Sequence, residues 1–287
     1  MEKIDKRILK EIYKKRPSEV KKYDYGFLLV IGGSELYSGS PALSALSAFR
    51  AGVDMVRVVA PKRAANIIAG FSPDIVSCAI ENDNLTKKDL PDIISMTESI
   101  KVISRGGEAV LIGGGMGRNK EVQETIIDYL SQISVPSVID ADGIHAVSLN
   151  TNILAGKPFL LTPHSYEFFV LTKKNVDGMS LGEKVSVVKE QAKRLQTTIL
   201  LKGNIDIISD GENVAINETG SSLMTKGGMG DTLAGIAGAM LARGNDVFKS
   251  AKASAYINGL AGEIAIKKYG EGVMATDLIS AIPEAIK

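Results

Sequence analysis

Near its C-terminus the chain reads Gly227-Gly-Met-Gly-Asp-Thr-Leu-Ala-Gly235, a glycine-rich turn directly before a predicted helix. Backbone N–H groups at such a helix start, left free of Cβ bulk by Gly227, Gly228 and Gly230, bind phosphate oxygens well. Asp231 follows them, and its negative charge is poorly placed for binding a phosphate passively. It is well placed to remove a proton from a hydroxyl group. A glycine-capped helix start is the alternative, but three glycines in four residues exceed what a cap needs. The stretch therefore predicts the chemical centre, with Asp231 as the catalytic residue.

Outward from this turn, short β-branched runs alternate with amphipathic segments along most of the chain. Gly26–Ile31 is a predicted strand, and the helix after it is expected to begin at Ser40-Pro41, with Ser40 as the N-cap. Further strands are predicted at Met55–Val59, Ala109–Ile112, Ser137–Ile139, Pro158–Leu161 and Thr198–Leu201, with helices at Lys120–Ile133 and Glu183–Leu195 and from about Asp231, Val247 and Thr276. Asp210-Gly211 predicts a hairpin between 204–209 and 213–216. The pattern predicts an α/β fold in a single domain, residues 26–287, with a mainly parallel central sheet and helices on both faces.

Polar and glycine-rich loops follow the predicted strands, and in a parallel sheet these loops meet at one edge, where ligands bind. The loops are Gly32–Ser34, Gly113–Gly117, Asp140–Asp142, Thr162–His164, Lys202–Gly203 and the 227–231 turn. Several remain open to two interpretations. His164 either touches substrate or caps a helix, and Asp140 and Asp142 either cap helices or lie beside magnesium. Lys202-Gly203 either packs against an adenosine or simply ends a strand. His145 is expected on an ordinary helical turn.

Composition and missing motifs exclude several classes of protein. Charge is balanced, with 34 basic and 33 acidic residues, so a nucleic-acid-binding surface is not expected. One cysteine, Cys78, allows no internal disulfide, and its Asp-Ile-Val-Ser-Cys-Ala-Ile setting predicts a buried strand and a core thiol. The Gly113–Gly117 loop lacks the spacing of a dinucleotide fingerprint, and no Walker loop or Gly-x-Ser-x-Gly elbow is present. With no apolar run near the roughly 20 residues of a membrane span, a cytoplasmic protein is expected.

Residues 1–25 are predicted to form an amphipathic helical extension. Ile4, Ile8, Leu9 and Ile12 fall on one helical face. Packing of this face on its own domain or on another subunit is expected, rather than binding to a membrane surface.

Six segments, taken in order, carry a resemblance to one family. They are Gly32-Gly-Ser-Glu-Leu-Tyr-Ser-Gly-Ser-Pro-Ala-Leu-Ser-Ala45, Ile112-Gly-Gly-Gly-Met-Gly117, Val138-Ile-Asp-Ala-Asp-Gly143, Leu161-Thr-Pro-His-Ser-Tyr-Glu167, Leu201-Lys-Gly203 and the 227–235 stretch. From about Gly26 to the C-terminus the chain resembles the ADP/ATP-dependent NAD(P)H-hydrate dehydratases, a branch of the ribokinase-like superfamily. The Gly-Gly-x-Gly-Asp pattern marks the superfamily, and the first segment with Thr-Pro-His narrows it to the dehydratases.

The resemblance implies a role for individual residues. It implies substrate contacts at Ser40, Gly115, Gly117, His164 and Asp231. It implies nucleotide contacts at Lys202, Gly203, Asn204, Ile205, Asp206, Gly227, Gly228, Met229 and Gly230. Four positions depart from the family pattern: Ser40 replaces the usual alanine, Gly114 the usual proline, Tyr166 a glycine and Asp206 a threonine. The acid at Asp206 weakens the expected nucleotide contact there.

The resemblance also implies the reaction. NADHX and NADPHX, the hydrates of the reduced nicotinamide ring, would be returned to NADH and NADPH with consumption of ADP, or of ATP, in the presence of Mg²⁺. A homotetramer and a separate epimerase on another chain are the implied partners. Two rivals remain: an ATP-dependent kinase of a small hydroxymethyl or hydroxyethyl vitamin precursor, and a nucleotide-binding regulator without turnover.

Overall fold

One ten-stranded sheet forms the centre of the computed structural model, which describes all of residues 1–287. The strand order is β1-β10-β9-β8-β7-β6-β5-β2-β3-β4, and β2 to β8 are parallel to one another. Only β9 is antiparallel to its neighbours, β8 and β10. The strands are β1 Glu2–Lys3, β2 Phe27–Ile31, β3 Met55–Pro61, β4 Val76–Ile80, β5 Glu108–Ile112, β6 Ser137–Ile139, β7 Phe159–Leu161, β8 Thr198–Leu201, β9 Asp206–Ser209 and β10 Val214–Asn217. The predicted, mainly parallel sheet is confirmed.

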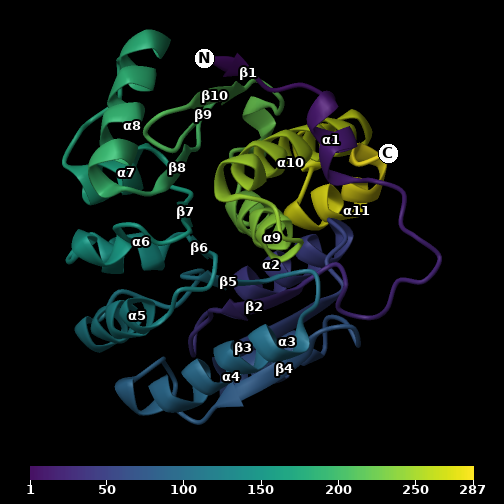
Figure 1. The fold of residues 1–287 in the computed structure, drawn as a ribbon, viewed down its shortest axis with the longest axis vertical. Coiled ribbons are helices and arrows are strands. Elements are labelled where there is room, and N and C mark those ends of the chain that lie inside the picture. The colour runs from purple at the N-terminus through teal and green to yellow at the C-terminus, as the bar shows by residue number, and fades with distance from the viewer.

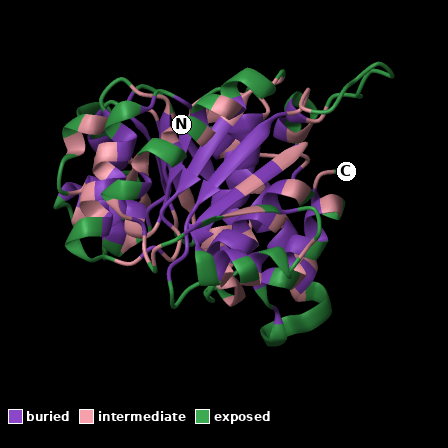
Figure 2. Cartoon of the chain, turned by 90° about the horizontal axis from the view of Figure 1, so that it is seen from below, coloured by how far each residue is buried: buried purple, intermediate pink, exposed green.

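Helices cover both faces of the sheet (Figure 1). They are α1 Arg7–Ile12, α2 Gly39–Arg50, α3 Lys62–Ala69, α4 Leu90–Ile103, α5 Lys120–Gln132, α6 Asp142–Val147, α7 Ser165–Thr172, α8 Leu181–Leu195, α9 Met229–Ala242, α10 Val247–Tyr269 and α11 Ala275–Ala285. Side chains of β2 alternate between two apolar clusters: Leu28 and Val30 pack with α2, α9 and α10, whereas Leu29 and Ile31 pack with α4 to α7. Because both faces are covered, the central strands are buried along nearly their whole length (Figure 2).

Close packing of α2 against α9 brings two distant parts of the chain together. A Cβ atom at Gly235 would overlap the carbonyl oxygen of Ser44 and the hydroxyl of Ser47, so only glycine allows this approach. The start of α9, with Asp231, consequently lies beside the first turn of α2, with Ser40.

The N-terminal segment is less helical than predicted. Its first residues form β1, which pairs in parallel with β10, and the N–H of Ile4 donates to the carbonyl of Ile216 at 3.0 Å. Helix α1 spans six residues only. Ile4, Ile8 and Ile12 are all buried in the core cluster beneath α10, so the apolar face packs on the chain's own domain and is not free for another subunit.

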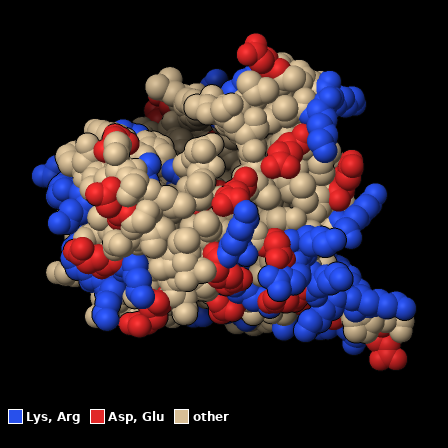
Figure 3. Space-filling view, turned by 90° about the horizontal axis from the view of Figure 1, so that it is seen from above, with Lys and Arg blue, Asp and Glu red and all other residues tan.

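Two features of the outer surface bear on the sequence predictions. Cys78 is half-buried rather than a core residue, because β4 is an edge strand with β3 as its one neighbour. Acidic and basic side chains both occur across the face drawn in Figure 3. No helix combines the length and apolar character that crossing a bilayer requires.

Candidate active site

The glycine-rich turn forms the N-terminus of α9, which begins at Met229, two residues before the predicted start. Gly228 is its N-cap and has φ +91°, a conformation that favours glycine. The N–H groups of Gly227, Gly228, Gly230 and Asp231 donate to no carbonyl or side chain of the protein. Four unpaired donors at the positive end of a helix dipole make this turn suited to phosphate oxygens.

Two cavities meet at this turn. One, of about 300 Å³, has Gly230 and Lys202 among its lining residues. The other, of about 380 Å³, is lined by Asp231, Ser40, Tyr37, Gly115 and Gly117. Consecutive residues, Gly230 and Asp231, thus face different cavities, and a group bound in one could react with a group bound in the other at this point.

The first cavity receives part of the predicted nucleotide set. Its lining includes Lys202, Gly203, Asn204, Asp206, Met229 and Gly230, together with Thr219, Met224, Leu233 and Asn258. Ile205 instead packs against the core of the opposite face, and Gly227 and Gly228 do not line the cavity. Sequence reasoning missed Thr219 and Asn258, which come from the loop after β10 and from α10.

Asp206 lies in the wall of this cavity. Its carboxylate accepts hydrogen bonds from the Gly203 N–H at 3.1 Å and from the Asn217 side chain at 3.0 Å. Burial raises the pKa of Asp206 to about 6, against the opposing effect of these two bonds and of Lys202. The acid that departs from the family pattern therefore also holds the turn between β8 and β9.

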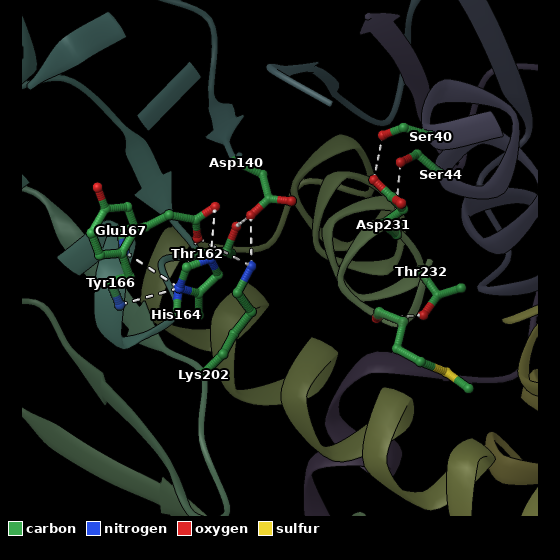
Figure 4. A network of polar contacts seen from close by, with 11 residues as sticks. Ser40, Ser44, Asp140, Thr162, His164, Tyr166, Glu167, Lys202, Asp231 and Thr232 are labelled. Atoms are coloured by element: carbon green, nitrogen blue, oxygen red, sulfur yellow. Dashed lines mark hydrogen bonds and ion pairs between the residues drawn. The ribbon is translucent and has the colours of Figure 1, made fainter. Parts of the chain in front are cut away.

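Asp231 itself is half-buried and lies against α2. The Ser40 hydroxyl donates to its Oδ1 atom, and the Ser44 hydroxyl donates to its backbone carbonyl at 3.0 Å (Figure 4). Burial raises the pKa of Asp231 to about 6, Ser40 opposes this rise, and Asp140 adds to it. A carboxylate that is a stronger base than usual, and still ionised at neutral pH, suits proton abstraction.

Ser40 does not cap α2 as predicted. The helix begins at Gly39, with Ser38 as its N-cap, so Ser40 lies inside the first turn with its hydroxyl directed to Asp231.

A buried ion network lies between the turn and the neighbouring strand ends (Figure 4). Nζ of Lys202 lies 2.9 Å from Oδ1 of Asp140 and 3.7 Å from Oε2 of Glu167, and both acids are almost fully buried. The Thr162 hydroxyl donates to the same Asp140 oxygen at 2.8 Å. Burial opposes the charge of Lys202, but the two carboxylates raise its pKa, so it stays protonated. The Asp140 carboxylate is thus part of this network and does not cap a helix.

His164 caps α7, the alternative interpretation of its sequence. Its Nδ1 accepts from the backbone N–H groups of Tyr166 and Glu167, at 3.2 and 3.4 Å. The backbone N–H of His164 in turn donates to Oε2 of Glu167 at 2.9 Å. His164 lines neither cavity. Sequence reasoning missed Glu167, although an acid three residues after a capping residue was the available signal. His145 lies in α6, as expected.

The second cavity is bounded by the loop after β5. Gly115 and Gly117 line it and have φ values of +68° and +83°. The Gly117 N–H donates to Asp142 at 2.9 Å, and Arg118 pairs with the same carboxylate at 2.7 Å. Asp142 therefore fixes this loop rather than capping a helix.

No group of three or more His, Cys, Asp or Glu side chains is arranged to hold a metal ion. The acids closest to the turn, Asp140 and Glu167, are engaged by Lys202. A cation here would need ligands from a bound nucleotide, as magnesium commonly takes from phosphates.

Comparisons with known proteins agree with this geometry. The sequence matches the family described as NAD(P)H-hydrate dehydratase over residues 28–284. It is 39% identical, over 274 residues, to the bifunctional NAD(P)H-hydrate repair enzyme of Pyrobaculum aerophilum, covering 95% of this chain and 52% of that protein. The chain thus spans about half the length of that relative.

A shorter relative and a solved structure match over nearly their whole lengths. The ADP-dependent (S)-NAD(P)H-hydrate dehydratase of Cenarchaeum symbiosum is 34% identical, covering 95% of this chain and 92% of the relative. The solved structure is that of the ADP/ATP-dependent NAD(P)H-hydrate dehydratase of Bacillus subtilis, co-crystallised with ATP and Mg²⁺. It superposes with a TM-score of 0.79 over 98% of this chain and 96% of that one. The sequence identity is 24%, so this likeness shows the shared ribokinase-like fold. On the family match and these identities, the chain belongs to the NAD(P)H-hydrate dehydratase family.

Proposed function

We propose that this chain converts (6S)-NADHX and NADPHX to NADH and NADPH, with ADP as its preferred co-substrate. The observation that carries the proposal is the position of Gly230 and Asp231 on either side of the boundary between two cavities. The nucleotide is assigned to the cavity with Lys202 and Gly230, whose N–H is one of the unpaired donors, and the hydrated nicotinamide ring to the cavity with Ser40 and Gly115. The ADP dependence named for the Cenarchaeum symbiosum relative supports ADP over ATP.

Asp231 removes the proton of the ring hydroxyl, whose oxygen then attacks the terminal phosphorus of the nucleotide. When ADP is the phosphoryl donor the leaving group is AMP, and when ATP is the donor it is ADP. The unpaired N–H groups of the turn stabilise the negative charge that develops on the phosphoryl group. The ring C–O bond then breaks with the phosphate as the leaving group, assisted by the ring nitrogen lone pair, and loss of the adjacent C–H proton restores the dihydronicotinamide. Phosphorylation is needed because hydroxide is a poor leaving group and phosphate a good one.

Magnesium is proposed to enter with the nucleotide, since the side chains form no ready-made metal site. It would neutralise charge on the phosphates. Asp140 and Glu167 are already paired with Lys202, and Asp206 is the carboxylate that lines the nucleotide cavity.

The test is to incubate the purified protein with NADHX and either ADP or ATP and to follow the return of dihydronicotinamide absorbance. Recovery with release of inorganic phosphate is expected, faster with ADP. A stable phosphate ester in place of phosphate would instead identify a kinase, and no recovery with either nucleotide would contradict the proposal. NADPHX should be tested in parallel.

The physiological setting proposed is a cytoplasmic homotetramer that acts together with a separate epimerase. Sedimentation velocity of the purified protein tests the oligomeric state, and a monomer would contradict it.

A further inference from the structure

Ser40 makes a contact that the proposed reaction does not by itself require. Its hydroxyl donates to the Oδ1 atom of Asp231, although the two residues are 191 positions apart in the sequence. Ser40 is almost fully buried in the first turn of α2, and the packing of that helix on α9 holds the two side chains together. A buried hydroxyl that donates to a carboxylate stabilises the ionised form of that acid.

Gly114 supplies the space that this hydroxyl occupies. A Cβ atom added at Gly114 would overlap the Ser40 hydroxyl and would lie 3.4 Å from Oδ1 of Asp231. The backbone of Gly114 does not itself require glycine, because its φ lies outside the left-handed region. The side chain of Ser40, rather than the loop conformation, thus explains the absence of a side chain at position 114.

The other charged groups that face Asp231 act in opposing directions. Asp140, at the end of β6, and Glu167, in α7, disfavour the ionised carboxylate, as burial does. Lys202, at the end of β8, favours ionisation, but it is already paired with those two acids. The hydroxyl of Ser40 is the one neutral side-chain group that donates directly to the Asp231 carboxylate.

We infer that Ser40 is a positioning residue: its hydroxyl keeps the Asp231 carboxylate ionised and directed toward the second cavity, and Gly114 leaves the space for it. The inference rests on the proposed role of Asp231 as a base. It assigns Ser40 to the orientation of that base rather than to substrate binding.

Three variants test the inference. Ser40→Ala removes the hydroxyl donor, Gly114→Ala displaces it, and the double variant carries both substitutions. Rates of NADHX dehydration with ADP are measured from pH 6 to 9. Ser40→Ala should raise the midpoint of the pH profile by about one pH unit. Relative to the wild type, the rate of this variant should be about fivefold lower near pH 6 than it is at pH 9, where Asp231 is ionised in both proteins. Gly114→Ala should give a similar shift, and the double variant no further shift.

Ser44→Ala is the matched control. Ser44 lies one turn further along α2 and donates to the backbone carbonyl of Asp231 instead of its carboxylate. A structural effect on the α2–α9 contact should appear in both serine variants, whereas the midpoint shift should appear only in Ser40→Ala. An unchanged midpoint in Ser40→Ala, or an equal shift in Ser44→Ala, would overturn the inference.

A readout without turnover separates this inference from the proposed function. The carboxyl carbon of Asp231 is followed by NMR titration of the ¹³C-labelled protein, with assignment from Asp231→Asn. A higher titration midpoint in Ser40→Ala supports the inference even if NADHX is not converted. An unshifted midpoint overturns it even if the wild-type protein is an active dehydratase.

Discussion

Replacement of Asp231 by Asn should stabilise the protein while abolishing most of its activity. Burial raises the pKa of this acid from its ordinary 3.8 to about 6. Between these two values the folded protein binds more protons than the unfolded chain, so the free energy of unfolding falls as pH rises. The ionised carboxylate then costs about 3 kcal/mol at neutral and higher pH, since one pKa unit corresponds to about 1.4 kcal/mol.

Asparagine carries no such cost, and its side-chain oxygen still accepts the Ser40 hydroxyl. The unfolding free energy of Asp231→Asn should therefore exceed that of the wild type by an amount that grows by about 2 kcal/mol between pH 4 and pH 8. Urea denaturation at pH 4, 5, 6 and 8, followed by circular dichroism, measures this difference. Activity should fall by at least about 10²-fold, with ADP affinity largely retained because the backbone donors of the turn remain.

The reasoning would be refuted by a stability difference that stays constant with pH, because a pH-independent gain cannot come from titration of Asp231. Full activity in Asp231→Asn would independently remove Asp231 as the base. Asp210→Asn is a suitable control: burial alone would raise the pKa of this half-buried loop acid, but its hydrogen bonds with Asn213 outweigh that effect and the pKa is lowered. Its pH dependence should have the opposite sign.

Three further predictions follow from the same contacts. Lys202→Met leaves Asp140 and Glu167 buried without a cation and should lower the free energy of unfolding by about 3–5 kcal/mol in the same denaturation assay. Lys193→Met is the control: its partner Glu212 is exposed, so the loss should be about 1 kcal/mol or less. Gly235→Ala overlaps α2 and should destabilise the protein by about 1–3 kcal/mol and reduce dehydratase activity; an unchanged melting temperature would contradict the packing argument. In the wild type, kcat/KM should rise with pH through a midpoint near 6 as Asp231 ionises, and a flat profile from pH 5.5 to 8 would contradict its role.

The parallel sheet and the position of the catalytic turn could be predicted because both depend on local sequence signals. Runs such as Phe27–Ile31 are apolar on both faces, which is typical of central parallel strands. The edge strands differed. Glu2–Lys3 gave no such signal and is wholly exposed. Val76–Ile80 was expected to be a buried strand, and it is a strand, but most of it is exposed or half-buried because it lies at the sheet edge. These strands form through pairing with β10 and β3, which a single sequence does not reveal.

The details of the site could be predicted less well, because they depend on contacts between distant segments. The bond from Ser40 to Asp231 and the pairing of Lys202 with Glu167 join different helices and strand ends. Local signals also misled in one case: Ser40-Pro41 has the composition of a helix start, yet α2 begins before it. For His164, the strand-end position left two interpretations open, and Glu167 three residues later is the local signal for the capping role that the structure shows.

The spacing within the turn explains how one helix start can serve both a phosphate and a base. Successive residues of an α-helix project about 100° apart around its axis. Gly230 therefore presents its backbone to the nucleotide cavity, while the Asp231 side chain projects toward Ser40 and the second cavity. A carboxylate at position 230 would lie near Lys202 and face the phosphates directly, since a Cβ there would be 3.6 Å from Nζ of that lysine. The order Gly-Asp, rather than Asp-Gly, thus keeps the Asp231 carboxylate apart from the nucleotide phosphates. Both still lie close enough to act on the same phosphoryl transfer.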